Sequence, residues 1–163
     1  IQSALWDFGF WFEIAGVDGD VDYVRTSVGI DYALSENIFA MVEYHYNGAG
    51  SDNPADYLGL FATIPYQRGG VFLLGQDYIM PSISFQVSPL WSIAAQAIYN
   101  LNDNSAFFSA SAEYNVAEDF YMDFGYYHFI GDELSLTAMG IPVLESEYGS
   151  NPNVLYTSLR FYF

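Results

Sequence analysis

The chain has no cysteine and no lysine, and its only basic residues are Arg25, Arg68 and Arg160. The missing cysteine excludes a disulfide framework, a thiolate metal site and a cysteine nucleophile. The three arginines stand against 20 acidic residues, which gives a formal net charge of −17. Nucleic-acid binding is therefore disfavoured, because the release of phosphate counterions needs clustered lysine and arginine.

Long hydrophobic runs are also missing. No stretch approaches the roughly 18 consecutive apolar residues of a membrane-spanning helix. The 163 residues are nevertheless 52 % hydrophobic and 20 % aromatic, which excludes a disordered chain and predicts a single domain over residues 1–163. The chain opens at Ile1 without a basic segment followed by an apolar one. We interpret it as a mature or truncated chain whose targeting segment, if it had one, has been removed.

The dominant pattern is alternation. Large apolar residues occupy every second position in eight segments, whose lengths match the roughly 9–11 residues that a tilted membrane strand needs. The eight segments are residues 4–15, 22–34, 38–47, 76–87, 91–101, 105–116, 120–130 and 153–163.

The two faces of these segments distinguish a membrane protein from a soluble β-protein. One face is aliphatic and aromatic, whereas the other carries mainly Ser, Gly, Ala and Asn with a few acids. A soluble sandwich would have polar faces rich in Lys and Glu, whereas a closed barrel turns its apolar face to lipid. The pattern predicts an all-β fold: an antiparallel up-and-down transmembrane β-barrel with eight strands in this chain.

Connection lengths predict the orientation. Residues 35–37, 88–90 and 117–119 form short turns, which such barrels keep on the periplasmic side. The two long connections, residues 48–75 and 131–152, are then outer loops. Within the first loop, Asn53 and Pro54 predict the start of a short helix. Its apolar side chains are expected either to narrow the lumen or to cap the barrel mouth.

Alternation also predicts register, because like faces must lie opposite one another. A first hairpin centred on Gly19 pairs Glu13 with Arg25, whereas a two-residue Asp18-Gly19 turn would oppose unlike faces and is rejected. The next hairpin, centred on Glu36, pairs Asp31 with Met41, Gly29 with Glu43 and Ser27 with His45. Pro81, which cannot donate to a ladder, predicts a bulge.

The final residues carry a resemblance to a known family. The stretch from Tyr156 to Phe163 resembles the C-terminal assembly signature of bacterial outer-membrane β-barrels, with aromatic or apolar residues at alternate positions (Tyr156, Leu159, Phe161, Phe163). Ser158 replaces the glycine usual in that signature. The resemblance implies a Gram-negative outer-membrane location, contact with the bilayer and lipopolysaccharide, and recognition by the barrel-assembly machinery. Residues 43–48 and 146–149 faintly resemble porin-like outer-membrane proteins.

Aromatic girdles are expected at both membrane interfaces. The lower girdle comprises Trp6, Tyr32, Trp91, Tyr114, Phe120 and Phe163, and the upper one Phe12, Tyr46, Tyr99 and Tyr126.

The sequence leaves open how many strands close the barrel. Eight strands can close into a barrel filled by side chains, which would place Asp7 and Arg160 at the seam as an ion pair. Alternatively, the chain is the C-terminal part of a larger, porin-like barrel.

Charged and polar residues of the inner face are the candidate site. They are Asp7, Glu13, Arg25, Asp31, Glu43, His45, Gln96, Glu113, Asp123 and Arg160. In a filled barrel they predict a hydrogen-bonded plug, and in a larger barrel a cation-preferring path.

The outer loops hold ten of the 20 acids, namely Asp18, Asp20, Asp22, Asp52, Asp56, Asp103, Asp132, Glu133, Glu145 and Glu147. Such a rim predicts weak association of calcium or magnesium, which could bridge it to lipopolysaccharide phosphates. The Asp18–Asp22 spacing lacks the remaining ligands of a calcium loop, so no metal site or cofactor is expected.

Catalysis is not expected either. His128 faces lipid, but no serine accompanies it, and the inward His45 suits a structural hydrogen bond, so no nucleophile–base arrangement is visible. The sequence therefore predicts a non-enzymatic structural or interaction module with acidic extracellular loops. A passive cation-preferring pore is the first alternative, and a lipid-modifying enzyme is the second.

Overall fold

A computed structural model describes residues 2–5 and 7–163, which form one antiparallel sheet of nine strands in the order β1-β2-β3-β4-β5-β6-β7-β8-β11. The strands of this sheet are β1 (Gln2–Leu5), β2 (Phe8–Val17), β3 (Tyr23–Ser35), β4 (Ile38–Asn47), β5 (Asp77–Ser88), β6 (Trp91–Asn100), β7 (Ala106–Ala117), β8 (Phe120–Ile130) and β11 (Val154–Phe161). A small hairpin of β9 (Ser135–Leu136) and β10 (Pro142–Val143) forms a second sheet.

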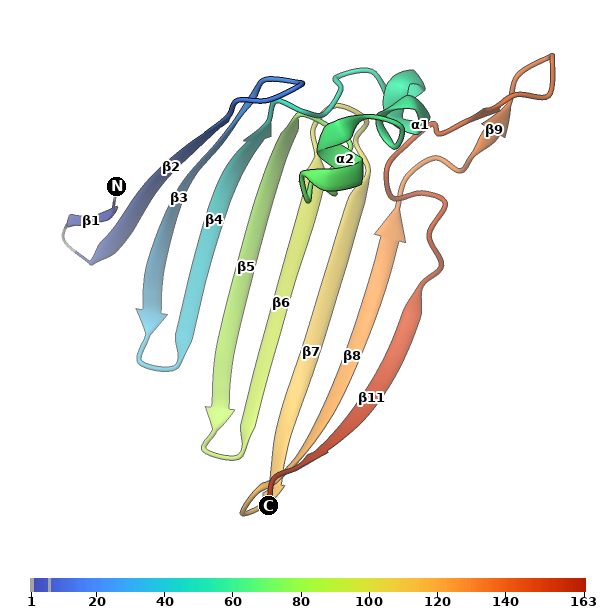
Figure 1. Cartoon of the computed structure of the whole chain (residues 1–163). Helices are drawn as coiled ribbons and strands as arrows, with labels where there is room; N and C mark the ends of the chain where they lie inside the picture. Colours follow the sequence, from blue (N-terminus) through green and yellow to red (C-terminus); the bar gives the residue numbers. More distant parts are fainter. Residues whose placement is uncertain (1, 6) are drawn as a thin grey trace.

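The sheet is open and curved (Figure 1). Its two ends differ: the short-turn end holds the turns β3–β4, β5–β6 and β7–β8, and the loop end holds the longer connections (Figure 1). Three short helices lie at the loop end: η1 (Pro54–Asp56), α1 (Tyr57–Leu60) and α2 (Ile64–Arg68). No helix in the described part of the chain is long and apolar enough to cross a membrane.

Burial is concentrated at the loop end. The fully buried side chains are Tyr57, Tyr78, Asn47, Asn100, Ser105 and Ser146, and most of them are polar. Large apolar side chains along the strands stay exposed instead, for example Val28 at 48 % and Ile83 at 44 %. In the described part of the chain the apolar face of the sheet is therefore uncovered, and the buried side chains gather at the loop end instead.

The predicted strands agree closely with the observed ones after the first segment. The three short turns lie where expected, and each is accompanied by a register shift, at Ala33/Ser35, Gln86/Ser88 and Asn115/Ala117. The β3–β4 pairing is also confirmed, since Asp31 faces Met41, Gly29 faces Glu43 and Ser27 faces His45. Asn53 caps η1 as predicted, accepting a hydrogen bond from the backbone N–H of Ala55 at 3.2 Å.

The first segment is not one strand. Residues 2–5 form β1, which turns back and pairs with the start of β2, so that Leu5 faces Phe8 and Gln2 faces Trp11. Trp6, expected in the lower girdle, lies outside the described residues.

The predicted β2–β3 register is wrong by two residues. Glu13 faces Ser27 and Trp11 faces Gly29, whereas Glu13 had been expected opposite Arg25. Like faces still lie opposite one another, so the rejection of the two-residue turn is confirmed. The observed register places the Trp11 indole over a glycine, the one residue type that leaves room for it.

Pro81 does not produce a bulge. Ile79 faces Tyr99 and Ser82 faces Gln96 in one unbroken register, and the ladder has no pairs at Met80 and Pro81. Because proline has no N–H to donate, the ladder to β6 is interrupted here, but no extra residue is inserted as in a bulge. On the other side, Pro81 still pairs with Val42 of β4.

Closure at eight strands is not found. Within the described residues, β11 pairs with β8 and no strand pairs with its other edge. The predicted Asp7–Arg160 seam pair is also wrong, because Arg160 instead binds two carboxylates of neighbouring strands. The confirmed part of the fold prediction is an all-β, antiparallel, up-and-down sheet.

Candidate functional site

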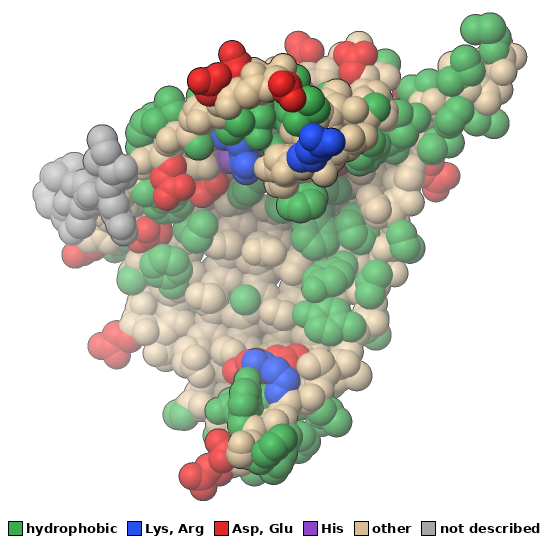
Figure 2. All heavy atoms as spheres, in the orientation of Figure 1, with side chains coloured by type: hydrophobic (Ala, Val, Ile, Leu, Met, Phe, Trp, Pro, Cys, Tyr) green, Lys and Arg blue, Asp and Glu red, His purple; other side chains and the backbone are tan. Residues whose placement is uncertain are grey.

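One face of the sheet carries the predicted polar residues. We call it the polar face. At its centre Gln96 of β6 lies between Ser82 of β5 and Ser109 of β7 in the ladder. Figure 2 shows this face: small and uncharged groups fill the centre, and charged groups gather towards the two ends.

Arg160 organises the charges near the short-turn end. Its Nε and Nη2 atoms donate to the two carboxylate oxygens of Asp123, each at 2.9 Å, and Nη2 also donates to Glu113. The guanidinium lies 5.7 Å from the centre of the Tyr121 ring. One cation therefore neutralises charge from two adjacent strands, β7 and β8, on an exposed part of the face.

A second charged group lies on β2, β3 and β4. The indole Nε1 of Trp11 donates to Glu43 at 3.2 Å, and Nδ1 of His45 lies 2.8 Å from the Ser27 hydroxyl. Glu43 and His45 are 3.9 Å apart at their closest polar atoms. His45 is itself buried, with Nε2 unpartnered.

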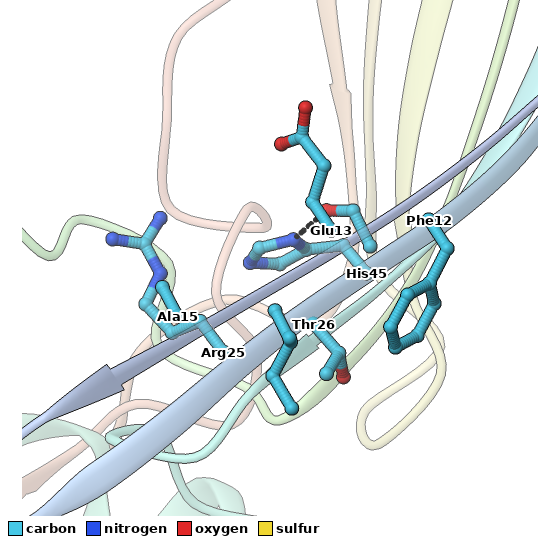
Figure 3. A pocket seen from close by; sticks show the side chains of 8 residues that line it. Phe12, Glu13, Ala15, Arg25, Thr26 and His45 are labelled. Atoms are coloured by element: carbon cyan, nitrogen blue, oxygen red, sulfur yellow. Dashed lines mark hydrogen bonds between the residues drawn. The ribbon is translucent and has the colours of Figure 1, made fainter. Parts of the chain in front are cut away.

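A hollow of about 560 Å³ lies beside this group, where the upper part of β2 meets β3. Figure 3 shows Glu13, Arg25 and His45 on one side of the strands and Phe12 and Thr26 on the other. The hollow thus wraps around the outer edge of β2 beyond the four residues of β1. We interpret it as space beside the edge strand of the described sheet, since its lining belongs to both faces.

The remaining predicted residues lie apart from these groups. Asp31 lies next to Gly9, where an added Cβ would come within 2.6 Å of its carboxylate oxygens. Asp7 is exposed in the turn that precedes β2. The structure therefore brings together Arg160, Asp123 and Glu113, and separately Glu43 and His45 with Trp11 and Ser27.

The terminal residues divide between the two faces. Tyr156 lies on the polar face over Gly125, with its ring centre 5.2 Å from that of Tyr127. Leu159 and Phe161 are exposed at 62 % and 66 %, and Phe163 is fully exposed.

The most connected group is one that the sequence did not predict. Glu147, expected to be a solvated loop acid, places its carboxylate among groups from three other segments. Oε1 accepts from the Leu74 backbone N–H at 3.0 Å, and Oε2 accepts from the Tyr78 hydroxyl at 2.6 Å and from Asn100 Nδ2 at 2.8 Å.

Other polar groups, buried or half-buried, extend this network. Asn100 also donates to the Tyr57 hydroxyl at 3.1 Å and to Asp103 at 3.2 Å. Asp103 in turn accepts from the Glu147 backbone N–H at 2.7 Å. We call the side chains of Glu147, Tyr78, Asn100, Tyr57 and Asp103 the loop-end network. It joins both long loops to the sheet.

Burial changes the acid–base properties of the loops. It raises the pKa of Glu147, although hydrogen bonds from Tyr78, Leu74 and Asn100 act in the opposite direction. Burial also raises the pKa of Tyr57 and of Tyr148. The hydroxyl of Tyr148 is buried without a hydrogen-bond partner.

The comparisons with known proteins add no relative. No protein-family model, no curated protein and no solved structure matches the chain. The arguments about function therefore depend on the geometry alone.

Catalysis at His128 and metal binding have little support from geometry. His128 is stacked on Tyr126 and lies 3.0 Å from Asn153 Oδ1, an arrangement without a serine nucleophile. In the described ranges no three His, Cys, Asp or Glu side chains are grouped to hold a metal ion. In the turn 18–22, Asp22 accepts from the Gly19 backbone N–H at 3.0 Å, which is an ordinary turn contact.

Proposed function

We propose that this sheet is part of the wall of an outer-membrane β-barrel that acts as a passive, cation-preferring pore. The apolar face contacts acyl chains, and the polar face lines the lumen. Strands beyond these nine complete the barrel. The observation that carries the proposal is an open sheet with one uncovered apolar face and one small-residue polar face.

The apolar face supports contact with lipid. Its exposed side chains run along the strands, and Val28, Ile83, Phe124 and Leu159 are 48 %, 44 %, 42 % and 62 % exposed. A contiguous apolar surface of this kind is rare on a soluble monomer. Aromatic pairs mark its short-turn end, with Phe8 stacked on Tyr32 at 4.5 Å and Trp91 on Tyr114 at 4.6 Å, as interfacial girdles would require.

The polar face supports a lumen wider than a filled eight-stranded barrel. Among the described residues its two edges are not joined to each other. Unpaired strand edges are costly in hydrocarbon, which favours closure through further strands. Its charges favour cations. Arg160 is already occupied by Glu113 and Asp123, which leaves Glu13, Asp31 and Glu43 against Arg25 near β2–β4.

The first long loop supports a restricted entrance. Tyr57 and Leu74 are buried against the loop end of the sheet, and α2 lies in front of the strands (Figure 1). Leu58 and Phe61, at 37 % and 52 % exposure, stay on the outside of this cover. Tyr57 and Leu74 thus anchor the loop over the polar face.

Membrane contact can be tested by quenching of tryptophan fluorescence with brominated acyl chains. The W6F/W11F variant retains Trp91 on the apolar face, and the W6F/W91F variant retains Trp11 on the polar face. We expect strong quenching of Trp91 and weak quenching of Trp11. Equal quenching of both, or of neither, would contradict the proposed orientation.

Pore activity can be tested in planar bilayers of neutral phosphatidylcholine under a KCl gradient. We expect ohmic steps with a cation-selective reversal potential, and in E43Q about a twofold lower cation-to-anion permeability ratio. E36Q, in the exposed β3–β4 turn, is the matched control and should behave as the wild type. Absence of ohmic steps would overturn the pore.

The structural module is the second candidate. It is favoured by the contacts among the charged groups, because Glu43 is bound by Trp11 and Glu113 and Asp123 by Arg160. In that case the protein inserts into bilayers without conducting, and the loop end is its working surface.

A further inference from the structure

The β2–β3 register holds two opposite charges apart on the polar face. Glu13 faces Ser27 and Arg25 faces Ala15, so Glu13 and Arg25 are diagonal neighbours in the ladder, a relation that separates Cα atoms by about 7–8 Å. Both side chains project from the same side of the strands (Figure 3). Among the described residues neither takes part in an ion pair, whereas Arg160 pairs with two carboxylates towards the short-turn end. An unpaired cation and an unpaired anion thus flank one gap.

His45 adds an unsatisfied polar atom to this gap. The side chain is 8 % exposed, its Nδ1 lies 2.8 Å from the Ser27 hydroxyl, and its Nε2 has no hydrogen-bond partner in the described structure. The ring turns Nε2 towards the side of Arg25 (Figure 3), whereas Glu43 lies 3.9 Å from the other nitrogen, Nδ1. Buried polar atoms are nearly always hydrogen-bonded, so the gap is suited to a polar occupant.

The gap is the polar-face part of the hollow of about 560 Å³ beside β2. Small-molecule sites typically have volumes of about 300–1,000 Å³. A further strand paired with β2 would fill the space beyond its edge, but the side chains of Glu13 and Arg25 stand out from the face and would stay accessible. Because the gap opens on the polar face, we expect its occupant to be a solute and not a lipid headgroup.

The charges around the gap fit a zwitterion better than a simple ion. An anion bound to Arg25 would be repelled by Glu13 and Glu43, and a cation bound to Glu13 would be repelled by Arg25. A solute with one carboxylate and one ammonium group meets each charge with its opposite. The planar guanidinium offers paired N–H donors to a carboxylate, and Nε2 of His45 donates as well when Nδ1 accepts from the Ser27 hydroxyl.

We propose that Glu13, Arg25 and His45 form a binding site for small α-amino acids in their zwitterionic form. Arg25 and Nε2 of His45 bind the carboxylate, and Glu13 binds the ammonium group. We call these three side chains the zwitterion site. Binding depends only on the charges and the geometry of the site. Its consequence, that amino acids are solutes of the pore, rests on the proposed function.

Alanine is the probe, and two controls each lack one of its charged groups. Propionate has the carboxylate without the ammonium group, and ethylammonium has the ammonium group without the carboxylate. Saturation-transfer difference NMR on the protein in micelles of a non-ionic detergent measures the affinity for all three at neutral pH. We expect alanine to bind about tenfold more tightly than either control, because each control loses charged hydrogen bonds. Absence of alanine binding, or equal affinity for alanine and propionate, would overturn the site.

Charge reversal tests the site through a gain of binding, which a misfolded variant would not show. R25E places two carboxylates at the gap and should exchange alanine for ethylammonium, and E13R places two arginines there and should exchange alanine for propionate. H45F, which keeps a ring and removes both nitrogens, should weaken alanine binding about tenfold. R68Q and E36Q change exposed residues of α2 and of the β3–β4 turn and should bind alanine as the wild type does. Failure of both reversals to gain the expected ligand would refute the proposal.

Swelling of proteoliposomes in isosmotic alanine separates the site from the pore. Alanine binding in micelles without swelling would support the zwitterion site and count against the pore. Swelling together with binding supports both. If E13R abolished alanine binding and left the swelling rate unchanged, the site would stand, but passage of amino acids through it would be refuted.

Discussion

The indole of Trp11 on β2 lies across Gly29 on β3, so closely that a Cβ added to Gly29 would come within 2.0 Å of the Trp11 ring. The same indole donates to Glu43 on β4 at 3.2 Å. One side chain thus spans three strands of the polar face, and the two-residue difference between expected and observed register follows from the space that it needs.

Gly29→Ala should therefore destabilise the sheet. The added methyl forces the indole off its position, and overpacking of this kind costs about 1–3 kcal/mol. Gly16→Ala is the control, because an added Cβ at Gly16 of β2 meets nothing within 4 Å. Urea unfolding in detergent, followed by tryptophan fluorescence, measures both, and equal midpoints for the two variants would refute the argument.

Asp123→Asn should lower the unfolding midpoint, whereas Asp7→Asn should not. Arg160 donates twice to Asp123 at 2.9 Å, and Asp7 lies exposed in the turn before β2. Thermal unfolding by circular dichroism checks the pair. A loss in Asp7→Asn as large as in Asp123→Asn would mean that the first and last strands meet at a seam, as in an eight-stranded barrel.

Asn47→Ala should loosen the first long loop. Asn47 is 1 % exposed, and its Nδ2 donates to the carbonyls of Leu73 at 2.7 Å and Gly75 at 3.1 Å. The Leu73 carbonyl keeps the Tyr66 hydroxyl as a donor, but the Gly75 carbonyl loses the Asn47 amide. This loss costs about 1–3 kcal/mol and should appear as faster proteolysis between residues 48 and 75. Asn151→Ala, at an exposed residue with longer contacts of 3.3 and 3.4 Å, should leave the cleavage rate unchanged.

Phe163→Ala should reduce insertion by the barrel-assembly machinery, if the terminal residues act as an assembly signature. The expected result is less heat-modifiable, membrane-embedded protein after reconstitution with that machinery. Leu155→Ala is the control, because it removes another largely exposed side chain, at 82 %, from β11 outside the signature. Equal yields from the two variants would count against a role for Phe163 in recognition.

Much of the sheet could be predicted because its determinants are local. Side chains in a strand alternate between faces with a period of two, so the segments after residue 22 are visible from their own residues. Register across the β3–β4 turn could also be predicted, since a short turn and like-face pairing leave few alternatives. Ser27 and His45 accordingly lie opposite one another, and the Ser27 hydroxyl forms a hydrogen bond of 2.8 Å with His45 Nδ1.

The wrong predictions for the first strands depend on features that the pattern of a single segment does not contain. The β2–β3 register depends on the fit of Trp11 over Gly29, a matter of shape and not of polarity. The division of the first segment into β1 and β2 occurs within a stretch whose alternation continues through the turn. Pattern alone could not reveal it.

The loop-end network was not predictable from pattern either. Glu147 binds partners that lie 47, 69 and 73 residues away in the sequence. In a polar loop, nothing local distinguishes it from Glu133 or Glu145. The one available signal was chemical: tyrosines and asparagines at the loop ends of the strands can supply donors for a half-buried carboxylate.

The β9–β10 hairpin extends away from the sheet at the loop end (Figure 1). Its tip carries Met139, which is 83 % exposed, and Gly140 with a φ of 75°. A peptide epitope inserted at this tip should disturb neither the strands nor the part of the loops that is bound to the sheet. Antibody access to it on intact cells would then report which end of the sheet faces the outside.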